Sequence, residues 1–212
     1  MTNFLHKLLL LTGLALLPIL GWARGIAFSE EMHGYAYHQG EYRSVSVYFK
    51  VVIDDIDAWR ANPQHLAKLS GELVFDRVSA GSVSGSLQIL APAPGAAPGR
   101  VLTYRFQGAT VQFIGIKHVY NDAGPDLLDD MTTLRGVFQA QGQAQPSVPD
   151  LLKGDAWTSE LQFEWWKPTT LWNFSWSFST IATPWYEELA VKILFLKTIF
   201  GNLAKVLFPW AI

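Results

Sequence analysis

Four aspartates, Asp122, Asp126, Asp129 and Asp130, lie close together in the stretch Ile114–Gly136 and are the residues best placed to do chemistry. Hard cations such as Ca²⁺ bind several carboxylate and carbonyl oxygens, so Asp122, Asp126 and Asp130 are candidate calcium ligands. Two of the carboxylates could instead act as a general acid and base. The stretch lacks the register of an EF-hand loop, and its Asn, Gly and Pro residues favour turns. A solvated acidic turn between two strands is therefore the third interpretation.

Other catalytic signatures are absent or incomplete. The run Gly81–Gly85 reads GSVSG, with Val83 where the hydrolase motif G-x-S-x-G requires serine. The chain has no cysteine, which excludes thiolate catalysis, disulfides and cysteine-ligated zinc. A P-loop, a dinucleotide-binding glycine motif and an H-E-x-x-H sequence are also missing. We predict no catalytic residue and favour a non-enzymatic role; the alternative is a small lipid- or steroid-related enzyme that uses Asp126, Asp129 and Asp130.

Aromatic residues are concentrated between Trp157 and Phe178. In Leu171–Phe178 alternate side chains are aromatic, and we interpret this stretch as a strand with a row of rings on one face. A barrel of about eight strands can hold one small apolar ligand, and ring-lined cavities suit lipids and sterols. The predicted ligand-binding residues are Trp165, Trp172, Phe174, Trp176, Phe178 and Lys117. A packed aromatic core would give the same pattern.

The elements that must position these residues are mainly strands. Alternating side chains predict strands at Tyr42–Ile53, Gly71–Asp76, Val83–Leu90, Val101–Phe106, Thr110–Val119, Thr132–Ala140 and Ser159–Trp166. Clusters of Gly, Pro, Asn and Asp separate them. Many short strands at regular intervals predict a mainly β fold, either an antiparallel β-barrel or a sandwich. The segment Asp57–Ser70, with Asn62-Pro63 as its start signal and Gly71 as its stop, predicts one short internal helix.

The amino-terminal segment has the layout of a secretory signal peptide. Lys7 precedes the uncharged run Leu8–Ala23, which ends in a small-x-small pattern. An uncleaved anchor is the competing interpretation, although the run is shorter than the ~20 residues that a membrane span needs. We predict a signal peptide over residues 1–23, a β-barrel-like domain over 24–183 and a separate helical segment over 184–212. Export of a disulfide-free chain indicates the periplasm or outer envelope.

The segment Pro184–Pro209 predicts a long amphipathic C-terminal helix. One apolar face at helical spacing consists of Leu189, Ile193, Leu196, Phe200, Leu203 and Leu207. The helix either packs on the barrel or lies in a membrane interface. A full span is disfavoured because Lys192, Lys197 and Lys205 lie inside it. In the interfacial interpretation the membrane contacts are Trp185, Leu196, Phe200, Phe208 and Trp210.

Three stretches resemble one known family. They are FSEEMHGYAY at Phe28–Tyr37, the segment from IDDIDAW to HLAKLSGEL at Ile53–Leu73, and GIKHVYNDAGPDLLDDMTTL at Gly115–Leu134. They resemble an accessory domain found with large bacterial oxidoreductases of the glucose-methanol-choline, or cholesterol-oxidase-like, group. In that group the domain accompanies flavin-dependent and α/β-hydrolase modules that act on steroid or lipid substrates.

The resemblance does not imply catalytic activity for this chain, because the flavin-binding glycine motif and the hydrolase serine are both absent. It implies a flavin-dependent oxidoreductase as a partner, and it draws attention to Lys117, Asp126 and Asp130. The formal net charge of −2 gives no basic field for nucleic acid. We therefore expect a non-enzymatic envelope protein that binds a lipid or sterol and associates with the membrane through its C-terminal helix. Calcium is the one cofactor that the sequence suggests.

Overall fold

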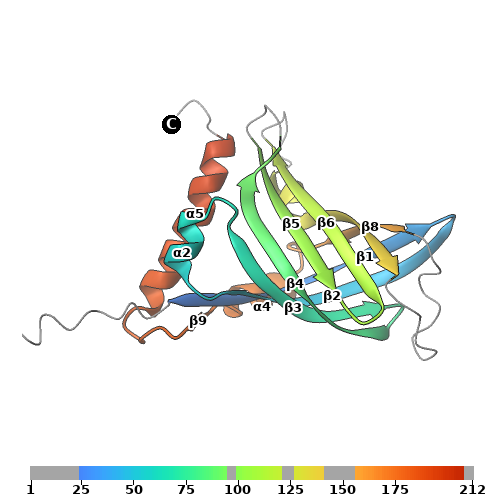
Figure 1. Cartoon of the computed structure of the whole chain (residues 1–212), viewed down its shortest axis with the longest axis horizontal. Coiled ribbons are helices and arrows are strands. Elements are labelled where there is room, and N and C mark those ends of the chain that lie inside the picture. Colours follow the sequence, from blue (N-terminus) through green and yellow to red (C-terminus); the bar gives the residue numbers. More distant parts are fainter. Residues whose placement is uncertain (1–23, 95–98, 121–126, 141–155, 208–212) are drawn as a thin grey trace, which may run out of the picture.

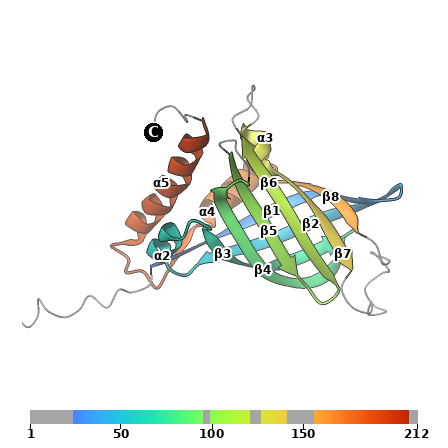
Figure 2. The ribbon, with the colours of Figure 1, turned by 45° about the horizontal axis from the view of Figure 1, so that its top comes forward.

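The computed structural model describes residues 24–94, 99–120, 127–140 and 156–207. They form an eight-stranded antiparallel β-barrel with one extra strand (Figures 1 and 2). The barrel strands are β1 (Gly25–His38), β2 (Glu41–Ile53), β3 (Leu66–Phe75), β4 (Val78–Pro92), β5 (Gly99–Gln107), β6 (Val111–Tyr120), β7 (Thr133–Ala140) and β8 (Trp157–Gln162). Each strand pairs with the next along the chain, and β8 pairs with β1 to close the barrel. The expected β-barrel is confirmed, and the sandwich alternative is wrong.

Alternation of side chains across each strand decides which residues fill the barrel. On β6, the inward-facing Val111, Phe113, Lys117 and Val119 are buried, and Gln112 between them is exposed. The same rule places Val45, Val47, Phe49 and Val51 of β2 inside. The period-two signal in the sequence therefore identified both the strands and their inner faces.

Aromatic rings from different strands meet in the barrel interior. The ring of Phe113 lies with its centroid 4.7 Å from that of Phe106 and 4.5 Å from that of Phe138. Phe75 reaches Phe138 at 5.3 Å, and Phe49 reaches Phe106 at 5.1 Å. Rings at these separations are in direct contact. A continuous chain of aromatic contacts thus runs from β2 and β3 across to β7.

Two short features set the barrel's curvature and register. The β1–β2 hairpin turns through Gln39 and Gly40 at φ of 47° and 91°, the left-handed pair that two-residue hairpins favour. In β3, a Cβ on Gly71 would lie 2.1 Å from the carbonyl oxygen of Tyr48 in the adjacent strand. Only glycine allows the two backbones to approach so closely.

The helices gather mainly at one end of the barrel. Strands β2, β4 and β6 end there, and α2 (Ile56–Ala61) and α3 (Leu127–Thr132) make the β2–β3 and β6–β7 connections. After β8 come α4 (Pro168–Trp176), the short strand β9 (Ser179–Ile181), which pairs with the start of β1, and α5 (Glu188–Leu207). Helix α5 contacts α2, β1, β4, β5 and β6, so it packs against that barrel end (Figures 1 and 2).

The short helix expected at Asp57–Ser70 is present, but its predicted end and its start signal are wrong. Helix α2 spans only Ile56–Ala61, and its N-cap is Asp55, whose Oδ1 accepts hydrogen bonds from the amides of Asp57 and Ala58 at 2.9 and 3.0 Å. The signal Asn62-Pro63 follows the helix and does not start it. The chain is already in β3 from Leu66, because its alternating side chains bury Ala67 and Leu69 in the barrel.

The expected strand at Leu171–Phe178 is a helix, and strand β1 was not predicted. Trp172 and Trp176 are four residues apart, which suits one face of a helix as well as one face of a strand. Pro168 at the first helical position favours the helix, because its fixed φ suits the start of a helix. In β1 the inward positions run Ile26, Phe28, Glu30 and Met32, and the carboxylate interrupts the apolar pattern.

Candidate functional site

Helix α5 presents apolar side chains on two opposite sides. Its barrel-facing side buries Val191, Phe195, Leu203 and Val206 in the main hydrophobic core. An α-helix turns about 100° per residue, so Leu189, Ile193, Leu196 and Phe200 share a line on the opposite side. These four residues, called here the α5 stripe, are 43% to 69% exposed. The sequence-predicted apolar face is therefore largely the outward face, and only Leu203 of it is buried among the described residues.

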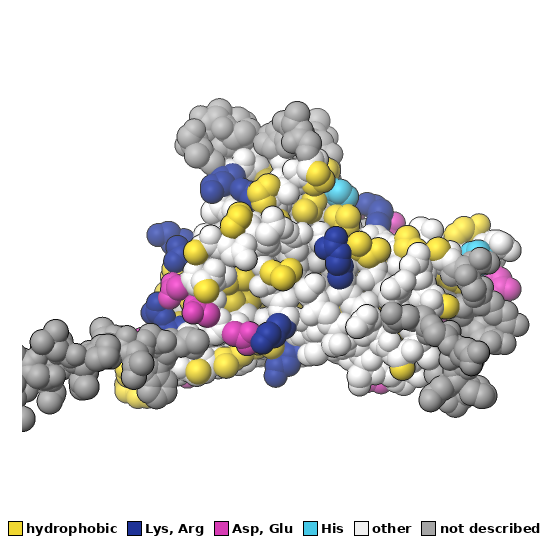
Figure 3. Space-filling view, viewed as in Figure 1, with side chains coloured by type: hydrophobic (Ala, Val, Ile, Leu, Met, Phe, Trp, Pro, Cys, Tyr) yellow, Lys and Arg dark blue, Asp and Glu magenta, His cyan; other side chains and the backbone are white. Residues whose placement is uncertain are grey.

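Aromatic and cationic side chains surround the α5 stripe. Trp185 and Tyr186, immediately before the helix, are 83% and 66% exposed. Lys192 and Lys197 lie about 70° to either side of the centre of the stripe, counted at 3.6 residues per turn. Figure 3 shows Lys and Arg side chains along the edge of the molecule where α5 lies, with hydrophobic side chains and some Asp and Glu side chains between them. The result is an outward apolar strip with aromatic groups at one end and positive charges along both sides.

A cluster of rings holds α4 and α5 on the barrel. Phe28 of β1 lies with its ring centroid 6.0 Å from Phe174, 5.2 Å from Phe178 and 5.8 Å from Phe195. Phe195 also reaches Trp59 of α2 at 5.7 Å. Because Phe28 and Trp59 are buried, these contacts bury the inner side of α5, whereas Leu189, Ile193, Leu196 and Phe200 on its outer side stay 43% to 69% exposed.

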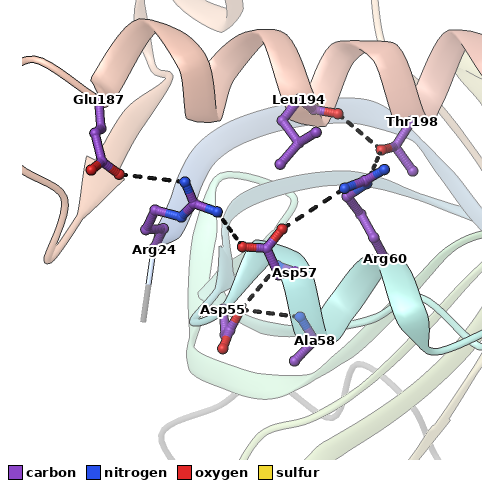
Figure 4. A network of polar contacts seen from close by, with 8 residues as sticks. All are labelled: Arg24, Asp55, Asp57, Ala58, Arg60, Glu187, Leu194 and Thr198. Carbon is purple, nitrogen blue, oxygen red and sulfur yellow. Dashed lines mark hydrogen bonds and ion pairs between the residues drawn. The ribbon is translucent and has the colours of Figure 1, made fainter. Parts of the chain in front are cut away.

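A polar network ties the start of α5 to α2 and to the first described residue (Figure 4). Arg24 donates to Asp57 and lies 3.4 Å from Glu187. Arg60 donates from Nε to Thr198 Oγ1 at 3.0 Å, and its Nη1 lies 3.8 Å from Asp57. Asp57 raises the pKa of Arg24 above its usual value, by hydrogen bonding and by charge. The network fixes the orientation of α5, and with it the direction in which the α5 stripe faces.

The predicted ligand-binding aromatics do not form one cavity. Trp165, Trp172 and Trp176 are exposed on the outer surface, and Trp172 and Trp176 contact each other with centroids 5.4 Å apart. Phe174 and Phe178 turn inward and join the ring cluster that holds the helices. A helix separates these side chains onto different sides, whereas the expected strand would have put them on one.

Lys117, also predicted to bind a ligand, lies inside the barrel in a buried polar triad. Its Nζ is 2.7 Å from Glu30 Oε1, and the Tyr104 hydroxyl donates to Glu30 Oε2 at 2.7 Å. The ammonium also lies 5.2 Å from the centroid of the Tyr104 ring. Burial raises the pKa of Tyr104 well above 10, and the charge and hydrogen bond of Glu30 raise it further. The triad occupies the core and neutralises its own charges.

The acidic stretch is described only in part. Asp122 and Asp126 lie outside the described residues. Asp130 accepts a hydrogen bond from the Tyr120 amide at 3.1 Å, and Asp129 accepts one from the Thr133 hydroxyl at 3.1 Å. Both carboxylates thus help to fasten the β6–α3–β7 connection. Among the described residues no group of three His, Cys, Asp or Glu side chains is arranged to hold a metal ion.

The structure describes only some of the predicted membrane contacts. Trp185, Leu196 and Phe200 are exposed on α5 or just before it, while Phe208 and Trp210 lie outside the described residues. In the part of the chain that the structure describes, no helix is both long and apolar enough to cross a bilayer.

Comparison with known protein families, with curated proteins and with solved structures finds no match. The resemblance to the oxidoreductase accessory domain therefore stays a prediction.

Proposed function

We propose that this protein is an exported, non-enzymatic envelope protein that binds lipid at a membrane surface, with α5 lying in the interface. The observation that carries the proposal is the outward exposure of the α5 stripe on a helix whose opposite side is anchored in the core. An apolar strip on a rigidly held helix is ready to enter a lipid surface without refolding. Membrane association then needs only that the barrel end carrying α5 approach the bilayer.

The surroundings of the stripe favour a lipid surface over a protein partner. Trp and Tyr side chains such as Trp185 and Tyr186 are enriched at the level of lipid headgroups. Lys192 and Lys197 extend from the flanks, where long basic side chains can keep their charges among headgroups while their stems cover apolar surface.

The beginning of the described chain lies on the same side. Arg24, which follows the apolar run Leu8–Ala23 in the sequence, contacts Glu187 just before α5. Whether that run is removed as a signal peptide or kept as an anchor, its attachment point is close to the proposed membrane face. An anchored chain would hold the α5 stripe at the bilayer from the outset.

The apolar ligand in this proposal is bilayer lipid itself, not a molecule enclosed in the barrel. Contacting rings of Phe49, Phe106, Phe113 and Phe138 occupy the interior. The exposed Trp172 and Trp176 of α4 offer a second apolar surface outside it. A flavin-dependent oxidoreductase with lipid or steroid substrates would contact this protein at the membrane surface that holds those substrates.

Vesicle flotation with a stripe variant and a matched control tests the proposal. Completing the burial of a half-exposed Ile or Phe contributes about 1 kcal/mol, so Ile193→Gln with Phe200→Gln should weaken partition by about 2 kcal/mol, or roughly 30-fold. The control pair Tyr42→Gln with Ile114→Gln also replaces two exposed apolar residues, but on the barrel wall. The proposal requires loss of flotation in the stripe variant only. Equal flotation of both variants, or dimerisation that depends on the stripe without lipid binding, would contradict it.

A further inference from the structure

A basic cleft lies beside the α5 stripe, between α5, α2 and the paired ends of β4 and β5. Its volume is about 520 Å³. The polar side chains that line it are Arg60, His65, Arg100, Lys197, Thr198, Asn202 and Lys205, and none of the described lining residues is a carboxylate. Four of these are permanent cations in a chain whose formal net charge is −2. The positive charge at the cleft is therefore local.

Most of these cations have no counter-ion within the described chain. Arg60 is held by Thr198 and lies 3.8 Å from Asp57. Among the described residues, Arg100 donates to the backbone carbonyl of Leu90 at 3.4 Å, and burial lowers the pKa of Arg100 below its usual value. Arg100, Lys197 and Lys205 form no ion pair with any carboxylate of the described residues. Cations that converge without a counter-ion attract an anion from solution.

The positive charges of the cleft affect the pKa of His65. It is buried, and its Nδ1 donates to the Ile89 carbonyl oxygen at 3.2 Å. Burial lowers the pKa of His65, the charges of Arg100 and Lys205 lower it further, and hydrogen bonds to Ile89 and Leu90 oppose the shift. An anion held between Arg100 and Lys205 would cancel part of that field. The pKa of His65 should therefore rise when an anion binds in the cleft.

Gly201 leaves the cleft open, although glycine lowers the stability of helix α5. It lies within α5 and lines the cleft, yet a Cβ at this position would meet no atom within 4 Å. Glycine in a helix interior is about 1 kcal/mol less favourable than alanine, and packing against the described residues does not require it here. A side chain at this position would project into the space between the cations.

We propose that this cleft binds the phosphate group of an anionic ligand, carried either by a lipid headgroup or by a small soluble molecule. Arg, Lys and Asn side chains on three different elements can each contribute donors to the separate oxygens of one phosphate. The lipid source deepens the proposed function, because Lys197 borders both the cleft and the α5 stripe. A headgroup could then sit in the cleft while its acyl chains lie along the stripe. The soluble source is independent of membrane binding.

Inorganic phosphate, followed by NMR at the His65 imidazole, tests the site without any membrane. The signal is assigned with His65→Gln, since the chain has five histidines. We expect a saturable shift of the His65 signals and a rise in its pKa. Lys197→Gln with Lys205→Gln should abolish the response, and so should Gly201→Leu, which fills the cleft while improving helix propensity. Lys50→Gln with Arg77→Gln removes the same charge from exposed positions on the barrel, away from α5 and the cleft, and should leave the response intact.

Vesicles then distinguish the two sources. Each basic residue near an anionic surface strengthens binding about fivefold, so the Lys197/Lys205 variant should lose about thirtyfold of the gain that phosphatidylglycerol gives over phosphatidylcholine. If the control variant loses the same amount while the phosphate response persists, the ligand is a soluble phosphate compound. No His65 response, together with equal vesicle binding by cleft and control variants, overturns the site. Stripe variants weaken binding to both kinds of vesicle, so failure of the proposed function is recognised separately.

Discussion

Replacing Lys117 with methionine should destabilise the fold strongly, because it leaves a carboxylate alone in the barrel core. Glu30 and Lys117 are both buried, and their 2.7 Å ion pair is joined by the Tyr104 hydroxyl. Removing one partner of such a buried pair costs about 3–5 kcal/mol, since the remaining charge stays desolvated. For a chain of this size that corresponds to a fall in melting temperature of roughly 6–20 °C.

Thermal unfolding at neutral pH, followed by circular dichroism, measures the effect. The double variant Lys117→Met with Glu30→Gln should recover most of the loss, because a neutral amide still accepts from Tyr104 and leaves no lone charge. Each variant that folds should bind vesicles as the wild type does, since the triad lies inside the barrel. If Lys117→Met melts within a degree or two of the wild type, or if it loses vesicle binding without losing stability, the structural role assigned to Lys117 is refuted.

Two further predictions concern the triad and the anchoring of α5. The pKa of Tyr104 is raised above 10.0 in the folded state, so Tyr104 stabilises the fold fully below pH 10 and loses that contribution as the pH rises further. The free energy of unfolding measured from pH 9 to 11 should therefore fall more steeply for the wild type than for Tyr104→Phe. Phe195→Ala should lose about 3–5 kcal/mol in urea unfolding because its ring is buried against Phe28, Trp59 and Phe178, whereas the exposed Phe200→Ala should change by no more than about 0.5 kcal/mol. Similar losses for the two would mean that α5 is not oriented as described.

The sequence predicted those parts of the fold that depend on local alternation. Strands β2, β5, β6 and β7 appear close to their expected bounds, because each places apolar residues inward at every second position. Strand β1 was missed since Glu30 occupies an inward position. Its neutralising partner Lys117 is 87 residues away, and no local pattern reveals such a pair.

The candidate site was predictable in its residues but not in its orientation. The spacing of Leu189, Ile193, Leu196 and Phe200 identified one apolar face of a helix, but the separate buried side with Val191 and Phe195 was not predicted. Periodicity alone cannot say which face the barrel covers, because that depends on the tertiary contacts of Phe195 with Phe28 and Trp59. The basic cleft was not recognised, since its cations come from three elements far apart in the sequence.

The most direct test of the central claim is whether the α5 stripe enters a lipid surface. The chain has no cysteine, so a single Ile193→Cys or Phe200→Cys substitution accepts one environment-sensitive fluorophore without further changes. On addition of vesicles we predict a blue shift and an intensity gain at these two positions, and no change at a label introduced by Tyr42→Cys on the barrel. Identical behaviour of the label at all three positions would contradict the account.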